Sequence, residues 1–361
     1  MPFDRGTFSL SILKLTGDLP SDALEKLDAM KAGKLDEVKD EQQVGWVSGR
    51  HLLERRIDEE TAFLGGHIYL NLRTAQRKVP SALLNAEAKM EELVYIKATG
   101  NSDVPRKVRK EIKEDIIEKR LPQMVPSISG LPLVIDQTDN TVYLGATSVR
   151  QIDNFLAVFN DSVDIAPIQM TAEEIMIEEK VDPRKYMGMP LSDSEVDEIY
   201  SPGRDFLTWL WYFSEEENGT LEVENYGKFA VAIDGPLSFI ADGKGALESV
   251  VRKGNPLKSA EARAALNVGK KLKKAKLLIC REKETWTAGF DADNFTFSSV
   301  GLPEGEEMDY ASRFAERINN LHIFKNVFRA LFVKFVTQAN ADDWKDKVAA
   351  IKKWVEVREC L

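Results

Sequence analysis

A short segment of the chain, Val104–Leu121, concentrates basic side chains on one side of a predicted helix. At about 100° per residue, Arg106, Arg109, Lys110 and Lys113 fall opposite an apolar stripe. Clustered guanidinium and ammonium groups attract anions, and nucleic acid is the nearest polyanion inside a cell. The segment therefore predicts an anion-binding face, with a solvated helix that carries internal ion pairs as the alternative. The apolar stripe comprises Val104, Val108, Ile112 and Ile116.

A second basic region runs from Lys244 to Lys276, where ten basic residues stand against two acidic ones, Glu248 and Glu261. This window has a net charge of +8, so the rest of a chain with net charge -10 carries -18. Such segregation predicts a basic surface on an acidic body, which would repel DNA everywhere except at the site. A lysine-rich, solvated helix end is the alternative. The predicted phosphate contacts here are Arg263, Lys270, Lys271, Lys273 and Lys274.

Sequence motifs for catalysis are absent. The chain has no GxxxxGK[ST] phosphate loop, no HExxH, no CxxC pair and no GxSxG elbow. The segment Gly243-Lys244-Gly245 lacks the upstream glycine and the following hydroxyl that a phosphate loop needs. We therefore predict no catalytic residue, no metal ligand and no cofactor.

The histidines and two aspartates were the remaining candidates for metal chemistry. His51, His67 and His322 stand in unrelated contexts, which favours structural or surface roles. Asp136 and Asp139 flank a predicted hairpin, where aspartate is expected on conformational grounds. Carboxylates alone are enough to hold Mg²⁺, so a metal-dependent nuclease stays open as an alternative.

Composition indicates the class of protein. At 361 residues, with 43% apolar and 30% charged residues, the chain predicts a soluble protein of two or three compact units. No segment resembles a secretory leader or the roughly 20 apolar residues of a membrane span, so we expect a cytoplasmic protein without a membrane partner. The two cysteines, Cys280 and Cys360, are too few for a disulfide framework and are expected to be reduced.

The N-terminal elements predict an α+β fold with antiparallel sheets and packed helices. Alternation in Thr7–Leu15 predicts a half-buried strand, and Ser21 is the expected N-cap of a helix. Gly45-Trp46-Val47 is expected in a loop, followed by a strand over His67–Leu72. Further expected elements are a helical hairpin of Ser81–Ile96 and Val104–Leu121, strands Leu131–Ile135 and Thr141–Leu144, and a helix over Val149–Phe159.

The C-terminal half begins with an acidic connector and an aromatic segment, Phe206–Phe213, expected in the core. A basic helix is predicted from Ser259 to Ala275, followed by an antiparallel meander and apolar C-terminal helices. The predicted regions are 1–170 with a projecting hairpin tip at 81–125, then 171–225, then 226–361. The other expected elements are strands Lys228–Ile233, Leu277–Arg281, Thr285–Phe290 and Phe295–Val300, and helices around Phe314–Phe335 and Ala341–Val357.

Several local patterns resemble the RdgC family of bacterial recombination-associated proteins. The resemblance covers residues 1–165 and 261–338. In the first part it rests on Gly45-Trp46-Val47, Lys78-Val79-Pro80-Ser81, Leu121-Pro122, Leu133-Val134-Ile135-Asp136 and Thr141–Leu144. In the second part it rests on Gly269-Lys270, Leu272, Leu277 and Arg313-Phe314-Ala315-Glu316-Arg317.

The resemblance implies a homodimer closed into a ring, whose positively charged hole admits duplex DNA with little sequence preference. It also implies antagonism of RecA filaments, association with the nucleoid, and no chemistry of the protein's own. Double-stranded DNA is the expected partner, with single-stranded DNA as a second candidate. Where the family can place an aromatic residue after the Leu-Pro pair this chain has Val125, so Met124 and Val125 are the predicted dimer contacts.

Two other functions remain open at this point. One is a metal-dependent DNA exonuclease that encircles its substrate. The other is a protein-interaction scaffold whose basic helix meets an acidic partner. Intact ends of a duplex incubated with Mg²⁺ or Mn²⁺ would argue against the nuclease, and absence of DNA retention at low salt would favour the scaffold.

Overall fold

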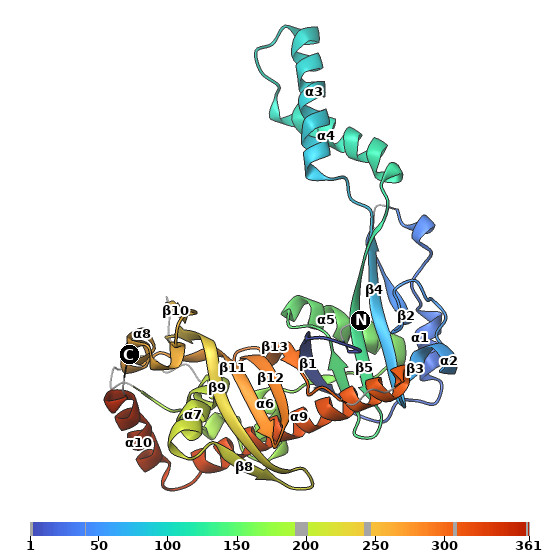
Figure 1. Cartoon of the computed structure of the whole chain (residues 1–361). Coiled ribbons are helices and arrows are strands. Elements are labelled where there is room, and N and C mark those ends of the chain that lie inside the picture. The colour runs from blue at the N-terminus through green and yellow to red at the C-terminus, as the bar shows by residue number, and fades with distance from the viewer. Residues whose placement is uncertain are drawn as a thin grey trace. The chain divides into compact units, whose positions relative to one another are not determined.

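The computed structural model (Figure 1) describes residues 3–39, 41–191, 201–241, 247–305, 309–358 and 360. Its contacts divide the chain into two compact units. The chain passes from one unit to the other after Leu19 and Ala62, and again within strands β4 (His67–Gln76) and β5 (Ser127–Asp136). The first unit comprises residues 1–19, 63–68 and 133–361, and the second comprises 20–62 and 69–132. The three sequence regions proposed above remain a prediction.

In the second unit, β2 (Gln43–Ser48) pairs antiparallel with β4, from Gln43 opposite Ala75 to Ser48 opposite Leu70. The expected loop at Gly45-Trp46-Val47 is therefore wrong, because these residues form the strand. A Cβ on Gly45 would lie 2.6 Å from the backbone of Ala32, so the glycine permits close packing instead of a turn. The short helices of this unit are α1 (Ala23–Ala29), η1 (Leu35–Glu37) and α2 (Glu59–Ala62).

The N-cap prediction for the first helix is also wrong by one residue. Asp22, and not Ser21, precedes α1, and its side chain makes no capping hydrogen bond. Within α1, Leu27 is fully buried and Leu24 is half-buried, whereas Met30, just after the helix, is 40% exposed. The helix is seven residues long, which leaves little room for a continuous apolar face.

The predicted helical hairpin is confirmed. Helix α3 (Ser81–Thr99) ends at Gly100, which adopts the left-handed conformation with φ 70°, and α4 (Arg106–Arg120) begins after Pro105. Proline suits the start of a helix because its missing N–H is not needed there, and glycine suits the end because it tolerates positive φ. The two helices contact each other, and α4 crosses α3 in Figure 1. A 3-10 turn, η2 (Leu121–Gln123), leads from α4 into β5.

In the first unit a large antiparallel sheet carries the strands in the order β10-β9-β11-β12-β13-β1-β6-β5. The predicted α+β class and the predicted C-terminal meander are confirmed. Short strands β3, β7 and β8 pair with β4, β1 and β9. The strands are β1 (Phe8–Lys14), β3 (Phe63–Leu64), β6 (Thr141–Leu144), β7 (Ile168–Gln169), β8 (Thr220–Val223), β9 (Gly227–Ile240), β10 (Glu248–Val251), β11 (Lys271–Arg281), β12 (Glu284–Asp291) and β13 (Thr296–Gly301).

Strand β1 is buried on both faces, which corrects the half-buried strand predicted from its alternation. It lies between β13 and β6, and even its serine, Ser11, is fully buried. The Ser11 hydroxyl donates a 2.7 Å hydrogen bond to the carbonyl of Ala146. A buried hydroxyl with a partner costs little, so the alternation reflects a satisfied polar group inside the protein.

Helices α7 (Pro202–Glu216) and α9 (Tyr310–Ala339) contribute most of the aromatic core of the first unit. The aromatic segment Phe206–Phe213 lies in α7 and was predicted to be in the core. Phe206 of α7 packs edge-on against Phe290 of β12 and Phe328 of α9. Trp209 donates its indole N–H to Gln338 at 2.9 Å, so the buried ring has no unpaired donor. The other helices are α5 (Val149–Val163), α6 (Ala172–Glu178), η3 (Pro183–Lys185), η4 (Pro256–Lys258), α8 (Ala260–Asn267) and α10 (Trp344–Val357). Among the described helices, none has an apolar stretch long enough to cross a bilayer.

Substituting Gly203→Ala is expected to lower the free energy of unfolding by about 1–3 kcal/mol, as overpacking of a tight core does. A Cβ at Gly203, at the start of α7, would lie 2.2 Å from the carbonyl oxygen of Ala292, which is backbone and cannot turn away. Urea denaturation measures the change. Gly17→Ala is the matched control, because nothing lies within 4 Å of its Cβ position. Equal stability of the two variants would contradict this account of the packing.

Candidate nucleic-acid interface

The basic face predicted on α4 is exposed. Arg106, Lys110 and Lys113 all point to solvent, while Val104 and Ile116 of the opposite stripe are buried. Within the described residues, Arg106 and Lys113 form no ion pair, and Lys110 forms one with Glu114 at 3.3 Å in which both side chains are more than half exposed. Exposed pairs of this kind are weak and exchange readily with other anions. The structure thus presents a row of three available cations.

Two further arginines of the helical hairpin form ion pairs within the second unit. Arg109 pairs with Asp103 and lies 3.6 Å from Glu92. Arg120 donates from Nε to Glu87 of α3 at 3.0 Å and from a second guanidinium nitrogen to the same carboxylate. This hydrogen bond lowers the pKa of the Glu87 carboxyl and raises that of Arg120. Arg120 therefore ties α4 to α3.

The basic helix predicted over Ser259–Ala275 is wrong beyond its first half. Helix α8 ends at Asn267, Gly269 adopts φ 81°, and β11 begins at Lys271. A positive φ at glycine terminates a helix without strain, so the lysines that follow enter a strand. Their side chains alternate between the two faces of the sheet instead of forming one ridge.

The strand places Lys271 inside the protein. Its side chain is 8% exposed, and its ammonium lies 2.7 Å from a carboxylate oxygen of Asp205, which is fully buried. The same carboxylate accepts hydrogen bonds from the Tyr186 hydroxyl at 2.9 Å and the Met189 backbone N–H at 3.1 Å. A phosphate contact by Lys271 would require breaking this buried network.

The other predicted contacts of this region also have partners. Lys270 donates to the Ser249 hydroxyl at 2.6 Å, and Arg263 donates to the Arg358 carbonyl at 2.9 Å. Lys273 lies 3.8 Å from Glu248 and 4.0 Å from Asp293. Lys274 pairs with Asp291 at 2.8 Å but remains 52% exposed, and Lys276 is 41% exposed on the same face of β11. The most accessible cations of β11 are thus Lys274 and Lys276. Lys244 and the segment Gly243-Lys244-Gly245 lie outside the described residues.

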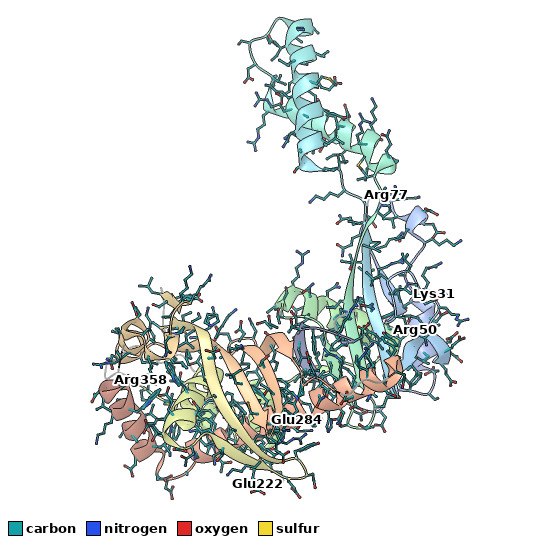
Figure 2. All side chains as sticks on the ribbon, in the orientation of Figure 1. Lys31, Arg50, Arg77, Glu222, Glu284 and Arg358 are labelled. Carbon is teal, nitrogen blue, oxygen red and sulfur yellow. The ribbon has the colours of Figure 1, made fainter. Side chains whose placement is uncertain are left out.

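The predicted dimer contacts follow the hairpin directly. Val125 is 87% exposed, which is unusual for a valine in an ordered segment, and Met124 is half-buried. Arg77, labelled in Figure 2, holds this turn by donating to the carbonyls of Val38 at 2.7 Å, Pro122 at 3.1 Å and Met124. The turn is therefore fixed while its valine side chain is left uncovered.

Sequence reasoning missed a cluster in the first unit. Asp136 and Asp139, at the turn between β5 and β6, lie beside His322 of α9, and their ligand atoms fall within 4.8 Å of one another. The Nδ1 atom of His322 is 3.1 Å from Asp139 and 3.8 Å from Asp136, and Nδ1 of His67 is 3.8 Å from Asp136. Two of the three histidines therefore meet the aspartates that flank the predicted hairpin. No local sequence pattern links these histidines to the aspartates, because β4, the turn between β5 and β6, and α9 are far apart in the chain.

Lys325 provides a positive charge at this cluster. Its ammonium pairs with Asp139 and donates to the Thr141 hydroxyl at 3.1 Å. Burial opposes ionisation of the Asp139 carboxyl, but His322 and Lys325 outweigh it and hold the pKa of this carboxyl well below its ordinary value. Burial lowers the pKa of His67, and Asp136 and Asp139 only partly oppose that effect. Burial also raises the pKa of the Tyr143 phenol, with Asp139 and Asp136 adding to the shift.

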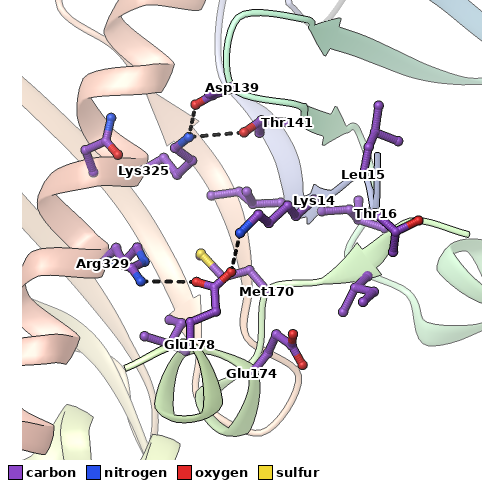
Figure 3. Close-up of a pocket in the computed structure, with 15 residues that line it drawn as sticks. Lys14, Leu15, Thr16, Asp139, Thr141, Met170, Glu174, Glu178, Lys325 and Arg329 are labelled. Carbon is purple, nitrogen blue, oxygen red and sulfur yellow. Dashed lines mark hydrogen bonds and ion pairs between the residues drawn. The ribbon is translucent and has the colours of Figure 1, made fainter. Parts of the chain in front are cut away.

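Asp139, Thr141 and Lys325 also line one part of a cavity of about 530 Å³ (Figure 3). Elsewhere in this cavity, Glu178 accepts from Lys14 at 2.5 Å and from Arg329 at 3.1 Å. The cavity thus contains cations and carboxylates that neutralise one another in pairs. Its apolar lining comes from β1, α6 and the residues beside them, and includes Ile12, Leu13, Leu15, Met170 and Ile175.

Comparisons with known proteins give the family context. A family model described as "Putative exonuclease, RdgC" matches residues 9–205 of the chain. A protein from Pseudoalteromonas atlantica, named Recombination-associated protein RdgC, is 30% identical over 115 residues. That match covers 32% of this chain and 38% of the relative, so it spans well under half of the relative's length.

Proposed function

The chain belongs to the RdgC family, and from this premise we propose that it binds duplex DNA through the phosphate backbone, without sequence preference and without cutting it. The observation that carries the proposal is the exposed row of Arg106, Lys110 and Lys113 on α4. This row lies opposite the side of α4 that packs in the hairpin, so DNA can reach it without disturbing the fold. Lys274 and Lys276 on the exposed face of β11 are the second proposed surface.

Phosphate contact suits these side chains better than base recognition. Residues 106 and 113 are seven positions apart, which is about 10 Å along a helix at 1.5 Å per residue. Over that distance duplex DNA presents about six phosphate charges, at one per 1.7 Å of its axis. Lysine and arginine at such a surface hold the backbone but do not read bases. The interaction is therefore electrostatic and depends on salt.

We also propose self-association through the hairpin, which would help to form a ring-shaped homodimer around the DNA. Helix α3 is apolar on a side that α4 does not cover, and Val125, just after η2, is also exposed. Exposed apolar groups gathered on one element are typical of interaction surfaces. A ring on the nucleoid would restrain RecA-dependent strand exchange by occupying the duplex. The exposed apolar side chains of α3 are Leu83, Met90, Leu93 and Val94.

A second candidate function is a metal-dependent DNA exonuclease. The specific observation that favours it is the cluster of Asp136, Asp139 and His322, whose donor atoms are of the kinds that bind divalent metals. The description of the matching family model, "Putative exonuclease, RdgC", names the same activity. The proposed binding function does not require this activity.

One incubation separates the two functions. An end-labelled linear duplex is mixed with the full chain at low salt, with Mg²⁺ or Mn²⁺, and divided between a native gel and a denaturing gel. We expect slower migration of the complex and strands of unchanged length. Shortened strands would instead support the exonuclease, provided that an independently purified sample also shortens them and that EDTA prevents the shortening. Unchanged migration in the native gel would contradict the binding proposal.

A further inference from the structure

We propose that Asp136, Asp139 and His322 form a binding site for one divalent transition metal ion of the Zn²⁺ or Mn²⁺ type. The site lies within the first unit, where the turn between β5 and β6 meets α9. It goes beyond the proposed DNA binding, because neither α4 nor β11 contributes a residue to it. The inference rests on distances, on the hydrogen bonds that orient the ligands, and on buried polar atoms without partners.

The distances suit a small metal ion. The imidazole nitrogen Nδ1 of His322 lies 3.1 Å from Oδ2 of Asp139 and 3.8 Å from Oδ2 of Asp136. A tetrahedral site with bonds of about 2.1 Å has ligand atoms about 3.4 Å apart. Small side-chain rotations therefore suffice to bring the three ligand atoms around one ion. A water molecule or another ligand would complete the coordination.

Neighbouring groups hold two of the ligands in place. The other ring nitrogen of His322, Nε2, is 2.9 Å from the Tyr226 hydroxyl, whose oxygen accepts a 3.0 Å hydrogen bond from Asn326. With a metal bound, a hydrogen on Nε2 directed at Tyr226 would leave the lone pair of Nδ1 for the ion. Asp136 uses Oδ1 to accept from the Thr138 N–H at 3.0 Å and hydroxyl at 2.6 Å, which leaves Oδ2 facing His322. Metal-binding histidines and carboxylates are commonly oriented in this way.

Buried atoms around the cluster lack hydrogen-bond partners. Within the part of the chain that the structure describes, these atoms include Oδ1 of Asp139, Nδ1 of His67 and the hydroxyl of Tyr143. Tyr143 is fully buried, and its hydroxyl interacts electrostatically with both aspartates. Buried polar atoms are nearly always paired, so several unpaired ones at one place are available to a bound ion and its water. A metal ion with a bound water would supply partners for them.

The donor set favours a transition metal over Mg²⁺. Mg²⁺ prefers six oxygen ligands and keeps several waters, whereas an imidazole nitrogen suits Zn²⁺, and Mn²⁺ accepts the two carboxylates. Lys325 is the competing cation, because its ammonium pairs with Asp139. Metal binding must displace this ammonium from the carboxylate. Removing the lysine should therefore strengthen metal binding, whereas removing a ligand should weaken it.

Equilibrium dialysis of the untagged full chain with Zn²⁺ and with Mn²⁺ tests the site. We expect one equivalent of metal per wild-type chain and an affinity at least tenfold weaker in Asp139→Asn and His322→Gln. Lys325→Met should bind more tightly than the wild type. His51→Gln is the matched control, because this histidine lies outside the cluster, and it should bind as the wild type does. Thermal melting by circular dichroism checks that each variant is folded.

Wild-type crystals soaked in Mn²⁺ provide a readout that does not depend on variants. An anomalous peak between Asp136, Asp139 and His322 is expected. Absence of a stoichiometric site in dialysis, a peak elsewhere, or equal affinity in wild type and His322→Gln would overturn the inference. DNA binding is measured separately, in EDTA. Failure to find the metal site would therefore not contradict the proposed DNA binding, and failure to bind DNA would not contradict the metal site.

Discussion

Lys271→Met is expected to lower the free energy of unfolding by about 3–5 kcal/mol, the usual cost of removing one partner of a buried ion pair. The ammonium of Lys271 is 2.7 Å from the buried carboxylate of Asp205, at the junction of β11 and α7. Methionine has a similar length but no charge, so the substitution leaves the Asp205 carboxylate in the core without its cation. The hydrogen bonds from Tyr186 and Met189 to Asp205 remain but cannot replace a full positive charge. Urea denaturation at neutral pH measures the loss.

Two controls identify the cause. Lys274→Met removes an exposed partner of Asp291 from the same strand and should cost at most about 1 kcal/mol. Adding Asp205→Asn to Lys271→Met removes the stranded charge and should restore part of the stability. If Lys271→Met costs no more than Lys274→Met, the buried ion pair does not stabilise the fold as described.

The triple substitution of Arg106, Lys110 and Lys113 by glutamine is expected to weaken duplex binding at least tenfold at low salt. It should also reduce the slope of log affinity against log salt concentration by about 2.7, since each phosphate contact contributes about 0.9. These side chains are exposed, so the fold should be unaffected. Fluorescence anisotropy with a labelled duplex, measured over a salt series, gives both quantities.

The matched control changes the same amount of charge elsewhere. Lys34, Lys345 and Lys353 are exposed and lie outside both proposed DNA surfaces, so their joint substitution by glutamine should leave the salt slope nearly unchanged. Lys274→Gln with Lys276→Gln tests β11 in the same way and ranks the two surfaces. An unchanged slope in both the α4 and the β11 variants would remove these residues from the DNA interface.

Local sequence patterns predicted much of the fold. The strand Thr141–Leu144 was predicted with its observed bounds, and the hairpin helices were placed within three residues at each end. Proline and glycine at the hairpin ends, and the strict apolar spacing of α4, are local signals that tertiary packing did not override. The same spacing correctly separated the exposed and packed faces of α4.

The lysine-rich segment could not be assigned from local pattern alone. The apolar residues between Ser259 and Ala275 fit a helical period, and Gly269 is tolerated in a helix at a cost of about 1 kcal/mol. Its positive φ and the pairing of β11 with β9 and β12 decide the outcome, and both depend on distant strands. For the same reason the burial of Lys271 against Asp205 was not foreseen.

The cluster of Asp136, Asp139 and His322 shows a second limit. Each residue taken alone had an ordinary explanation, either a turn aspartate or an isolated histidine. Their chemistry arises only because α9 packs near the turn between β5 and β6, which is a tertiary contact without a local signature. Self-association is harder still to predict from local sequence patterns, because it depends on contacts with a second chain.

The most direct test of the central claim is the affinity of the wild-type chain for two linear duplexes of unrelated sequence, measured by anisotropy across a salt series. The account predicts equal affinities for the two duplexes and a linear fall of log affinity with log salt concentration, with a slope reflecting at least three phosphate contacts. Lack of binding to either duplex at low salt, or binding to one sequence alone, would contradict it.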